Sequence, residues 1–173
     1  MGTIEERKGL HTLLPALKYL KEENVEYKMN IVGEQADKRY FDNLLEYIKK
    51  HELNVEFIGF QGKEGKREIF SKTDIFVFPS LLEGFGMVLV EAQTFGLPIV
   101  TFNNSAMPYT VKNNENGILV PTGDSLELGK AVAKLIQDRG LRDRLSASAY
   151  ENVNLQNDQS DFENSILSFF RRV

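Results

Sequence analysis

The chain has 173 residues, a length typical of one domain that buries its core without disulfide or metal support. It has no cysteine, which excludes disulfides, thiolate metal sites and thiol nucleophiles and fits a reducing cytoplasm. A formal net charge of −4 gives no overall basis for nucleic-acid binding, and no apolar run approaches the ~20 residues of a membrane span.

The N-terminal region predicts a short strand followed by an amphipathic helix. Residues 1–4 are too short for a complete first strand, yet a helical pattern follows at once, which suggests a fragment of a longer protein or an altered N-terminus. Leucines recur at helical spacing from Lys8 to Glu23, so Arg7 and Lys8 stand at a strand-to-helix turn. Taken alone, Lys8 is most simply a solvated surface lysine.

Two strand–helix units follow, each with the pattern of an α/β sheet. Residues 26–33 alternate between polar and apolar and end in glycine, as a strand does. The next helix has its apolar residues on one face, and the later strands are short apolar runs. The predicted order here is strand 26–33, helix 40–48, strand 55–59, loop 60–63, helix 66–71 and strand 74–78.

The stretch after residue 78 predicts a ligand-binding strand, loop and helix. A proline and two glycines form the loop that leaves the buried strand, and Met87 to Thr94 form the next helix. In an open α/β sheet the crevice beyond the carboxyl ends of the strands takes the ligand. Free backbone N–H groups at a helix start, here near Gly86, Met87 and Val88, favour a phosphate in that crevice.

Two carboxylates, Glu83 and Glu91, bracket this loop with seven residues between them. Glu91 lies one turn past Met87 on the same helix face, while Glu83 lies on the loop across the crevice. A carboxylate only accepts hydrogen bonds, which suits the vicinal hydroxyls of a ribose or hexose attached to a bound diphosphate. The alternative is that both are solvated charges at a helix start, where carboxylates are favourable.

Small and aromatic residues complete the predicted pocket. Gly84 and Gly86 permit close approach of the backbone to a ligand, and Phe85 between them would form one wall. The sequence contains no Asp-x-Asp cluster that would hold a metal ion. No metal site is therefore predicted.

The rest of the chain continues the alternation of strands and helices. Asp124 opens a helix with an aspartate variant of the capping box. The whole pattern implies one domain over residues 1–173, with an α/β, Rossmann-like, doubly wound and mainly parallel sheet and helices on both faces. The predicted order is strand 97–102, loop 103–108, strand 117–121, helices 124–136 and 141–150, polar connector 152–160 and amphipathic helix 160–172.

One constellation resembles a known family. Glu83-Gly-Phe-Gly, the second carboxylate Glu91 and then Ala-x-x-x-Gly-x-Pro-Ile-Val over residues 92–100 are similar to the signature of glycosyltransferase group 1 (family 4), retaining enzymes with the GT-B fold. The resemblance implies the C-terminal, donor-binding half of such an enzyme. It also implies that an N-terminal acceptor domain is missing and that the terminal helix 160–172 crosses back to pack on it.

The resemblance also implies roles for basic residues. Lys8-Gly9 matches the family's lysine that contacts the donor diphosphate. The family's arginine about five positions earlier is Thr3 here, so the adjacent Arg7 is the candidate second cation. Lys8, with the backbone N–H groups of residues 86–88, would stabilise the charge that develops on the β-phosphate as the nucleotide leaves.

The carboxylates bind the sugars in this scheme. Glu91 would bind the ribose hydroxyls, and Glu83 would bind the donor sugar near its oxocarbenium-like charge; the sequence alone does not support Glu83 as a covalent nucleophile. Loop 60–63 would line the nucleobase pocket. Pro108-Tyr109 replaces the family's usual Pro-Glu pair at the rim of the sugar pocket, which leaves the donor sugar open.

The resemblance therefore implies a donor-binding domain of a cytoplasmic, retaining glycosyltransferase that transfers a hexose-type sugar to an unknown acceptor. Its partners would be the nucleotide-diphosphate sugar, based on UDP, GDP or ADP, and the missing N-terminal domain. No cofactor, metal or nucleic acid is expected, and membrane association would be peripheral and through that domain. The 173 residues alone should be inactive.

Two other functions remain open. A nucleotide-sugar epimerase uses this type of domain but favours other residues where Glu83 and Glu91 stand. A non-catalytic flavodoxin-like module, such as a receiver domain, needs an acidic cluster at early strand ends, whereas residues 31–33 and 57–59 both end in glycine. Because these functions share a scaffold, only the site separates them.

Overall fold

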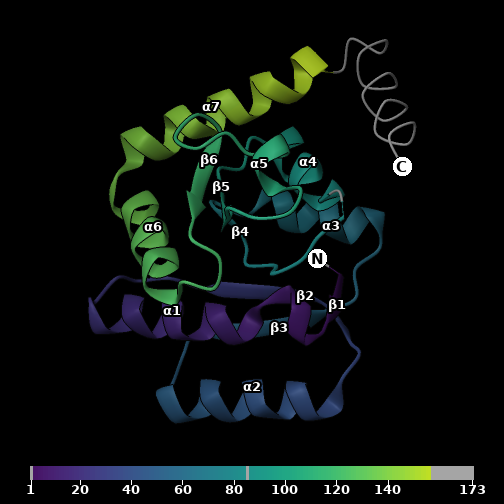
Figure 1. Cartoon of the computed structure of the whole chain (residues 1–173), viewed down its shortest axis with the longest axis vertical. Helices are drawn as coiled ribbons and strands as arrows, with labels where there is room; N and C mark the ends of the chain where they lie inside the picture. Colours follow the sequence, from purple (N-terminus) through teal and green to yellow (C-terminus); the bar gives the residue numbers. More distant parts are fainter. Residues whose placement is uncertain (1, 85, 157–173) are drawn as a thin grey trace.

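The structure is a computed structural model that describes residues 2–84 and 86–156. The predictions for Phe85 and for the terminal helix 160–172 fall outside the described residues. Strands and helices alternate along the chain as predicted (Figure 1). The elements are β1 (Gly2–Ile4), the 3₁₀ helix η1 (Glu6–Lys8), α1 (Leu10–Glu22), β2 (Met29–Gln35), α2 (Lys38–His51), β3 (Val55–Gly59), α3 (Lys63–Ser71), β4 (Phe76–Phe78), α4 (Met87–Thr94), β5 (Ile99–Phe102), α5 (Met107–Thr110), β6 (Gly117–Val120), α6 (Ser125–Gln137) and α7 (Arg139–Gln156).

The strands form two parallel three-stranded sheets, ordered β1-β2-β3 and β4-β5-β6. β1 and β4 are the edges that face each other, because residues of both line one cavity. Across the molecule the strands therefore run in the order 3-2-1-4-5-6, which is the order of a doubly wound fold. The predicted Rossmann-like parallel sheet is confirmed, and it is interrupted between β1 and β4.

Helices cover both faces of this arrangement. α1, α2 and α6 contribute to one apolar core, whereas α3, α4 and α5 contribute to a second. Successive residues of β5 point to opposite faces, so Val100 and Phe102 belong to the first core and Ile99 to the second. A strand buried on both faces explains why this segment is mostly apolar in the sequence.

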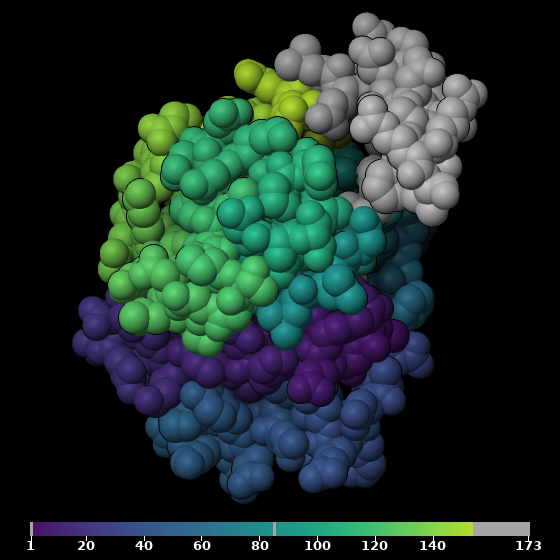
Figure 2. Space-filling model, viewed as in Figure 1, coloured from purple at the N-terminus to yellow at the C-terminus, as the bar shows by residue number. Residues whose placement is uncertain are grey.

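Helix α1 connects the two sheets. It packs against α6 on one side and α2 on the other (Figure 1). In the space-filling view the N-terminal residues form a purple band between the blue α2 region and the teal and green C-terminal half (Figure 2). The core-facing residues of α1 are almost completely buried and include Leu13, Leu14, Leu17 and Leu20. α1 therefore holds the halves together where β1 and β4 do not pair.

Most element boundaries differ from the sequence prediction. The strand predicted over 26–33 covers Met29–Gln35, and the helix Met107–Thr110 begins inside the predicted loop 103–108. Helix α7 continues to Gln156, so the polar connector predicted from residue 152 is wrong over 152–156. α1 begins at Leu10 rather than at residue 8, and α3 begins at Lys63 rather than at residue 66. The length of α7 follows from a buried stripe that repeats every four residues and spans the predicted boundary. This stripe consists of Leu141, Leu145, Ala149 and Val153.

Gly9 holds the two sheets together at their carboxyl ends. Its φ of +68° is left-handed, which delays the start of α1. A Cβ at this position would collide with the carbonyl oxygen of Pro79. This close approach lets the Leu81 N–H donate to the Arg7 carbonyl at 2.8 Å. The loops after β1 and β4 are therefore held side by side, next to the candidate site.

Candidate functional site

A cleft of about 720 Å³ opens at the carboxyl ends of β1, β2, β3 and β4. The loops after β1 and β4, the loop after β3, and the starts of α3 and α4 all contribute to its walls. This is the sheet edge at which open α/β folds bind ligands, as predicted from the sequence. The predicted site residues that the structure brings together in the lining are Lys8, Glu83, Gly86, Met87, Val88 and Glu91.

Lys8 and Glu83 form the more enclosed of two ion pairs in this cleft. Lys8 Nζ lies 2.7 Å from Glu83 Oε2, and the two side chains are only 16% and 19% exposed. The ammonium also lies 5.7 Å from the centre of the Phe78 ring, whose face attracts a cation. An ammonium held in this way by a carboxylate is equally suited to bind a phosphate oxygen.

A second ion pair, Lys66–Glu91, joins α3 to α4. Lys66 Nζ donates to both carboxylate oxygens of Glu91, at 2.7 and 2.9 Å. The sequence analysis identified Glu91 but not Lys66. The signal that could have found it is the pair Lys63 and Lys66 in the first turn of α3, where the helix dipole disfavours cations.

The start of α4 presents backbone N–H groups next to these charges. Its N-cap is Gly86, at a left-handed φ of +71°, and a Cβ there would lie 3.0 Å from Leu89 Cδ1. The Leu89 N–H donates to the Gly86 carbonyl at 2.7 Å, which closes the first turn tightly. The first N–H groups of a helix have no partner within it, and Met87 and Val88 line the cleft. The helix start and Lys8 together form a candidate binding site for an anion.

Arg7 is directed to Glu5 instead of the cleft. Its Nη2 lies 2.7 Å from Glu5 Oε1, and Arg7 is not among the described residues that line the cleft. The Thr3 hydroxyl also donates to Glu5 Oε1 at 2.7 Å, and this bond, with Arg7, lowers the pKa of the Glu5 carboxyl below its ordinary value. Thr3 thus helps to hold the carboxylate that engages Arg7. Diphosphate binding by Arg7 stays a prediction.

The outer part of the cleft is more apolar. Phe60 and Met87 both line it, and their side chains are 75% and 51% exposed. The loop 60–63 therefore reaches the same cleft as the start of α4. Gly84 is exposed and is not among the described lining residues. An exposed aromatic ring beside charged groups offers a face on which a flat heterocycle stacks.

Neither a metal cluster nor a membrane span is found in the described part of the chain. Within residues 2–84 and 86–156, no three His, Asp or Glu side chains gather in a group that could hold a metal ion. No helix in these ranges is both long and apolar enough to cross a bilayer. Metal-independent action stays a prediction.

Comparison with known proteins identifies related sequences over most of the chain. Residues 1–152 match the family described as glycosyl transferases group 1. The chain is 33% identical over 150 residues to the phosphatidyl-myo-inositol mannosyltransferase of Mycobacterium leprae, covering 86% of this chain and 39% of that protein. It is 28% identical over 153 residues to the capsular polysaccharide biosynthesis glycosyltransferase CapM of Staphylococcus aureus, covering 88% and 40%. The chain thus spans well under half the length of these relatives.

Solved structures show the same fold. The C-terminal domain of the group 1 glycosyl transferase LpcC from Francisella tularensis matches with a TM-score of 0.83 at 24% identity, covering 90% of this chain and 83% of that one. Anabaena HepE, solved in complex with UDP and glucose, matches with a TM-score of 0.84 at 23% identity, covering 99% of this chain and 48% of that one. The fold is therefore that of one half of a GT-B structure.

Proposed function

The chain belongs to the group 1 glycosyltransferases, and from that premise we propose that it binds the nucleotide-diphosphate sugar donor of a retaining enzyme that transfers a hexose-type sugar. The observation that carries this proposal is the pair of site carboxylates, Glu83 and Glu91, each held by a lysine beside the start of α4. A single cleft thereby offers cations for a diphosphate and acceptors for two sugars.

The diphosphate binds between Lys8 and the first N–H groups of α4. Both favour an anion, the first through its charge and the second through unpaired donors and the helix dipole. In the free protein Lys8 is already paired with Glu83 at 2.7 Å. A phosphate oxygen replaces the carboxylate on Lys8 when the donor binds. Glu83 then becomes an acceptor for a hydroxyl of the transferred sugar.

The nucleoside part lies toward Glu91 and Phe60. Glu91 accepts hydrogen bonds from the ribose hydroxyls, and Lys66 orients its carboxylate by bonding to both oxygens. The exposed ring of Phe60 supplies a stacking face for the base. Stacking is tolerant of base identity, so UDP, GDP and ADP all remain candidate carriers. The identity of the donor sugar stays open, because Pro108-Tyr109 replaces the family's usual Pro-Glu pair at the rim of the sugar pocket.

Catalysis in this proposal is electrostatic. The bond from the sugar carbon to the β-phosphate oxygen breaks and its electron pair moves to that oxygen, where Lys8 and the α4 N–H groups stabilise the new charge. The acceptor hydroxyl bonds to the sugar carbon on the face that the phosphate leaves, which retains the configuration. Its proton passes to the departing phosphate. These groups supply the stabilisation that a metal ion otherwise provides, so no metal is required.

The acceptor site belongs to the part of the protein outside these 173 residues. We expect an N-terminal domain there, located in the cytoplasm with the donor pool, to bind the acceptor and to close over the cleft. Any association with a membrane is peripheral and runs through that domain. The 173-residue chain alone is expected to bind nucleoside diphosphate weakly and to transfer no sugar, because half of the crevice is absent.

Calorimetry of the 173-residue chain with UDP, GDP and ADP tests the proposal. At least one should bind, and Lys8→Ala should weaken it by roughly 10-fold or more, as expected for a hydrogen bond to a charged group. Lys130→Ala is the matched control, because Lys130 pairs with Glu127 on α6 and is not among the described residues that line the cleft. Folded protein that binds none of the three at millimolar concentration would contradict the donor-site assignment, as would equal losses in the two variants.

A further inference from the structure

The charged side chains among the described residues that line the donor cleft do not balance. They are two glutamates, Glu83 and Glu91, and three lysines. Lys8 pairs with Glu83 and Lys66 pairs with Glu91, each at 2.7 Å. The third lysine, Lys63, is exposed and makes no ion pair or hydrogen bond within the part of the chain that the structure describes. The cleft therefore holds one positive charge that its described residues leave free for a ligand.

Lys63 lies at the end of the cleft where the proposed function places the nucleobase. It is the first residue of α3 and follows shortly after Phe60, whose exposed ring is the stacking face. Lys66, about one helical turn further along α3, bonds to Glu91, the proposed acceptor for the ribose. The path along α3 toward its start therefore leads from the ribose to the base. Lys8, on the other wall, stays with the diphosphate.

The other polar side chain beside the stacking face is turned back onto the protein. Gln61 Nε2 donates to the Ile58 carbonyl at 3.2 Å, and Gln61 Oε1 lies against Gly65 of α3. A lysine at the first position of a helix gains nothing from the helix dipole, which favours anions there. The stability of α3 therefore does not account for Lys63. Among the described residues around Phe60, Lys63 is the side chain that is free to bond to the edge of a base.

We propose that Lys63 determines the class of donor nucleotide, by donating a hydrogen bond from its ammonium to a ring carbonyl oxygen of the base. This inference rests on the proposed function and narrows it to bases with an oxo group, such as uracil and guanine. An ammonium has three donors and no acceptor, so it bonds to uracil O4 or guanine O6. Cytosine and adenine have an amino group at the same ring position, which presents N–H donors and gives the ammonium no acceptor. Stacking on Phe60 does not make this distinction.

Calorimetry with two pairs of nucleoside diphosphates, UDP with CDP and IDP with ADP, tests this inference. Each pair exchanges an oxo group for an amino group at one ring position. The oxo member of each pair should bind roughly 5-fold or more tightly, the scale of one hydrogen bond to a charged group. Lys63→Met removes the donors and should bring both ratios to about 1, whereas Lys63→Arg should preserve the preference. Lys72→Met, paired with Glu68 outside the cleft, is the matched control and should leave both ratios unchanged.

The contrary outcomes separate this inference from the proposed function. If Lys63→Met weakens all four nucleotides equally, Lys63 binds the phosphates and the inference is wrong. Ratios near 1 in the unsubstituted chain, or ratios that Lys63→Met leaves unchanged, overturn it as well. In each of these cases binding that depends on Lys8 leaves the donor site in place. If folded chain binds none of the four nucleotides, the proposed function itself fails and the inference fails with it.

Discussion

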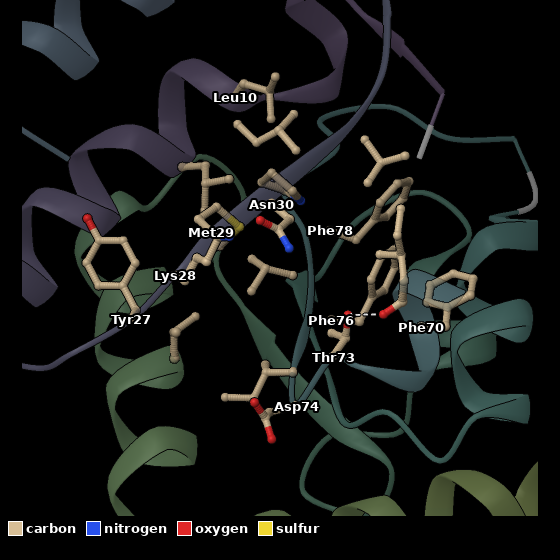
Figure 3. Close-up of a pocket in the computed structure, with 18 of the residues that line it drawn as sticks. Leu10, Tyr27, Lys28, Met29, Asn30, Phe70, Thr73, Asp74, Phe76 and Phe78 are labelled. Carbon is tan, nitrogen blue, oxygen red and sulfur yellow. Dashed lines mark hydrogen bonds between the residues drawn. The ribbon is translucent and has the colours of Figure 1, made fainter. Parts of the chain in front are cut away.

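The donor cleft and the cavity of about 450 Å³ between β2 and β4, here called the slot (Figure 3), share a wall but differ in how their polar groups are satisfied. Gly2, Lys8, Val32 and Phe78 line both. In the cleft each carboxylate already has a lysine, at 2.7 Å in both pairs. In the slot the β4 edge and residues 29–32 of β2 have no strand partner among the described residues. The cleft is therefore suited to a ligand that exchanges with internal partners, whereas the slot is lined mainly by apolar side chains.

This difference predicts separate consequences for substitutions in each region. Changes at the Lys66–Glu91 pair should alter affinity for nucleotide and leave stability nearly unchanged, because these side chains are 30% and 40% exposed and such ion pairs contribute little to stability. Changes where the loops after β1 and β4 contact each other should alter stability first.

Gly9→Ala should lower the stability of the folded chain by about 2–4 kcal/mol, because it combines a left-handed φ with a backbone collision. The φ is +68°, and the colliding atom is the Pro79 carbonyl oxygen. Urea unfolding measures the loss. The matched control is Gly140→Ala, where a Cβ meets only Asp138 Oδ1 at 3.5 Å and stability should be unchanged or slightly higher. Equal stabilities would show that the loops after β1 and β4 move apart freely.

Glu91→Ala should weaken binding of a nucleoside diphosphate by roughly 1.5–3 kcal/mol, since the ribose hydroxyls lose a charged acceptor. The melting temperature should hold, because the Glu91 side chain is 40% exposed. Calorimetry and thermal unfolding of the same sample separate the two effects. Glu127→Ala, which removes a glutamate from an exposed lysine pair on α6, is the matched control and should change neither. An unchanged affinity would indicate that Glu91 is a solvated surface charge that does not bind the ribose.

Glu83→Gln should tighten binding of the bare nucleoside diphosphate by up to about 1 kcal/mol, because Lys8 no longer has a competing carboxylate. The affinity for the nucleotide sugar should rise less or should fall, since its sugar loses a charged hydrogen-bond acceptor. Competition calorimetry of the two ligands gives the ratio directly. A loss of affinity for the bare nucleotide as large as in Glu91→Ala would show that both carboxylates bind the nucleoside.

Lys66→Met should weaken nucleoside diphosphate binding by about 0.5–1 kcal/mol, because Glu91 loses the ammonium that orients both of its oxygens. The loss should disappear with a 2′,3′-dideoxy nucleoside diphosphate, which makes no use of Glu91. Lys72→Met, at the other end of α3 and paired with Glu68 outside the cleft, is the control. A loss that persists with the dideoxy ligand would place Lys66 on the phosphates instead.

Local features of the sequence were sufficient to predict the order of elements and the part of the cleft that lies between Glu83 and Glu91. The alternation of apolar runs and amphipathic helices predicts strand β3 and helix α4 at their observed bounds, Val55–Gly59 and Met87–Thr94. The spacing of Glu83 and Glu91 around the α4 start also predicts that both line one cleft, as they do. These inferences succeed because helical and strand periodicities are local, and because the carboxyl ends of parallel strands share one edge.

Only the tertiary structure decided which charges meet. Lys8 reaches Glu83 across 75 positions and Lys66 reaches Glu91 across 25, so no local pattern connects them. Arg7, one residue before Lys8, pairs with Glu5 because the short 3₁₀ turn sends adjacent side chains in different directions.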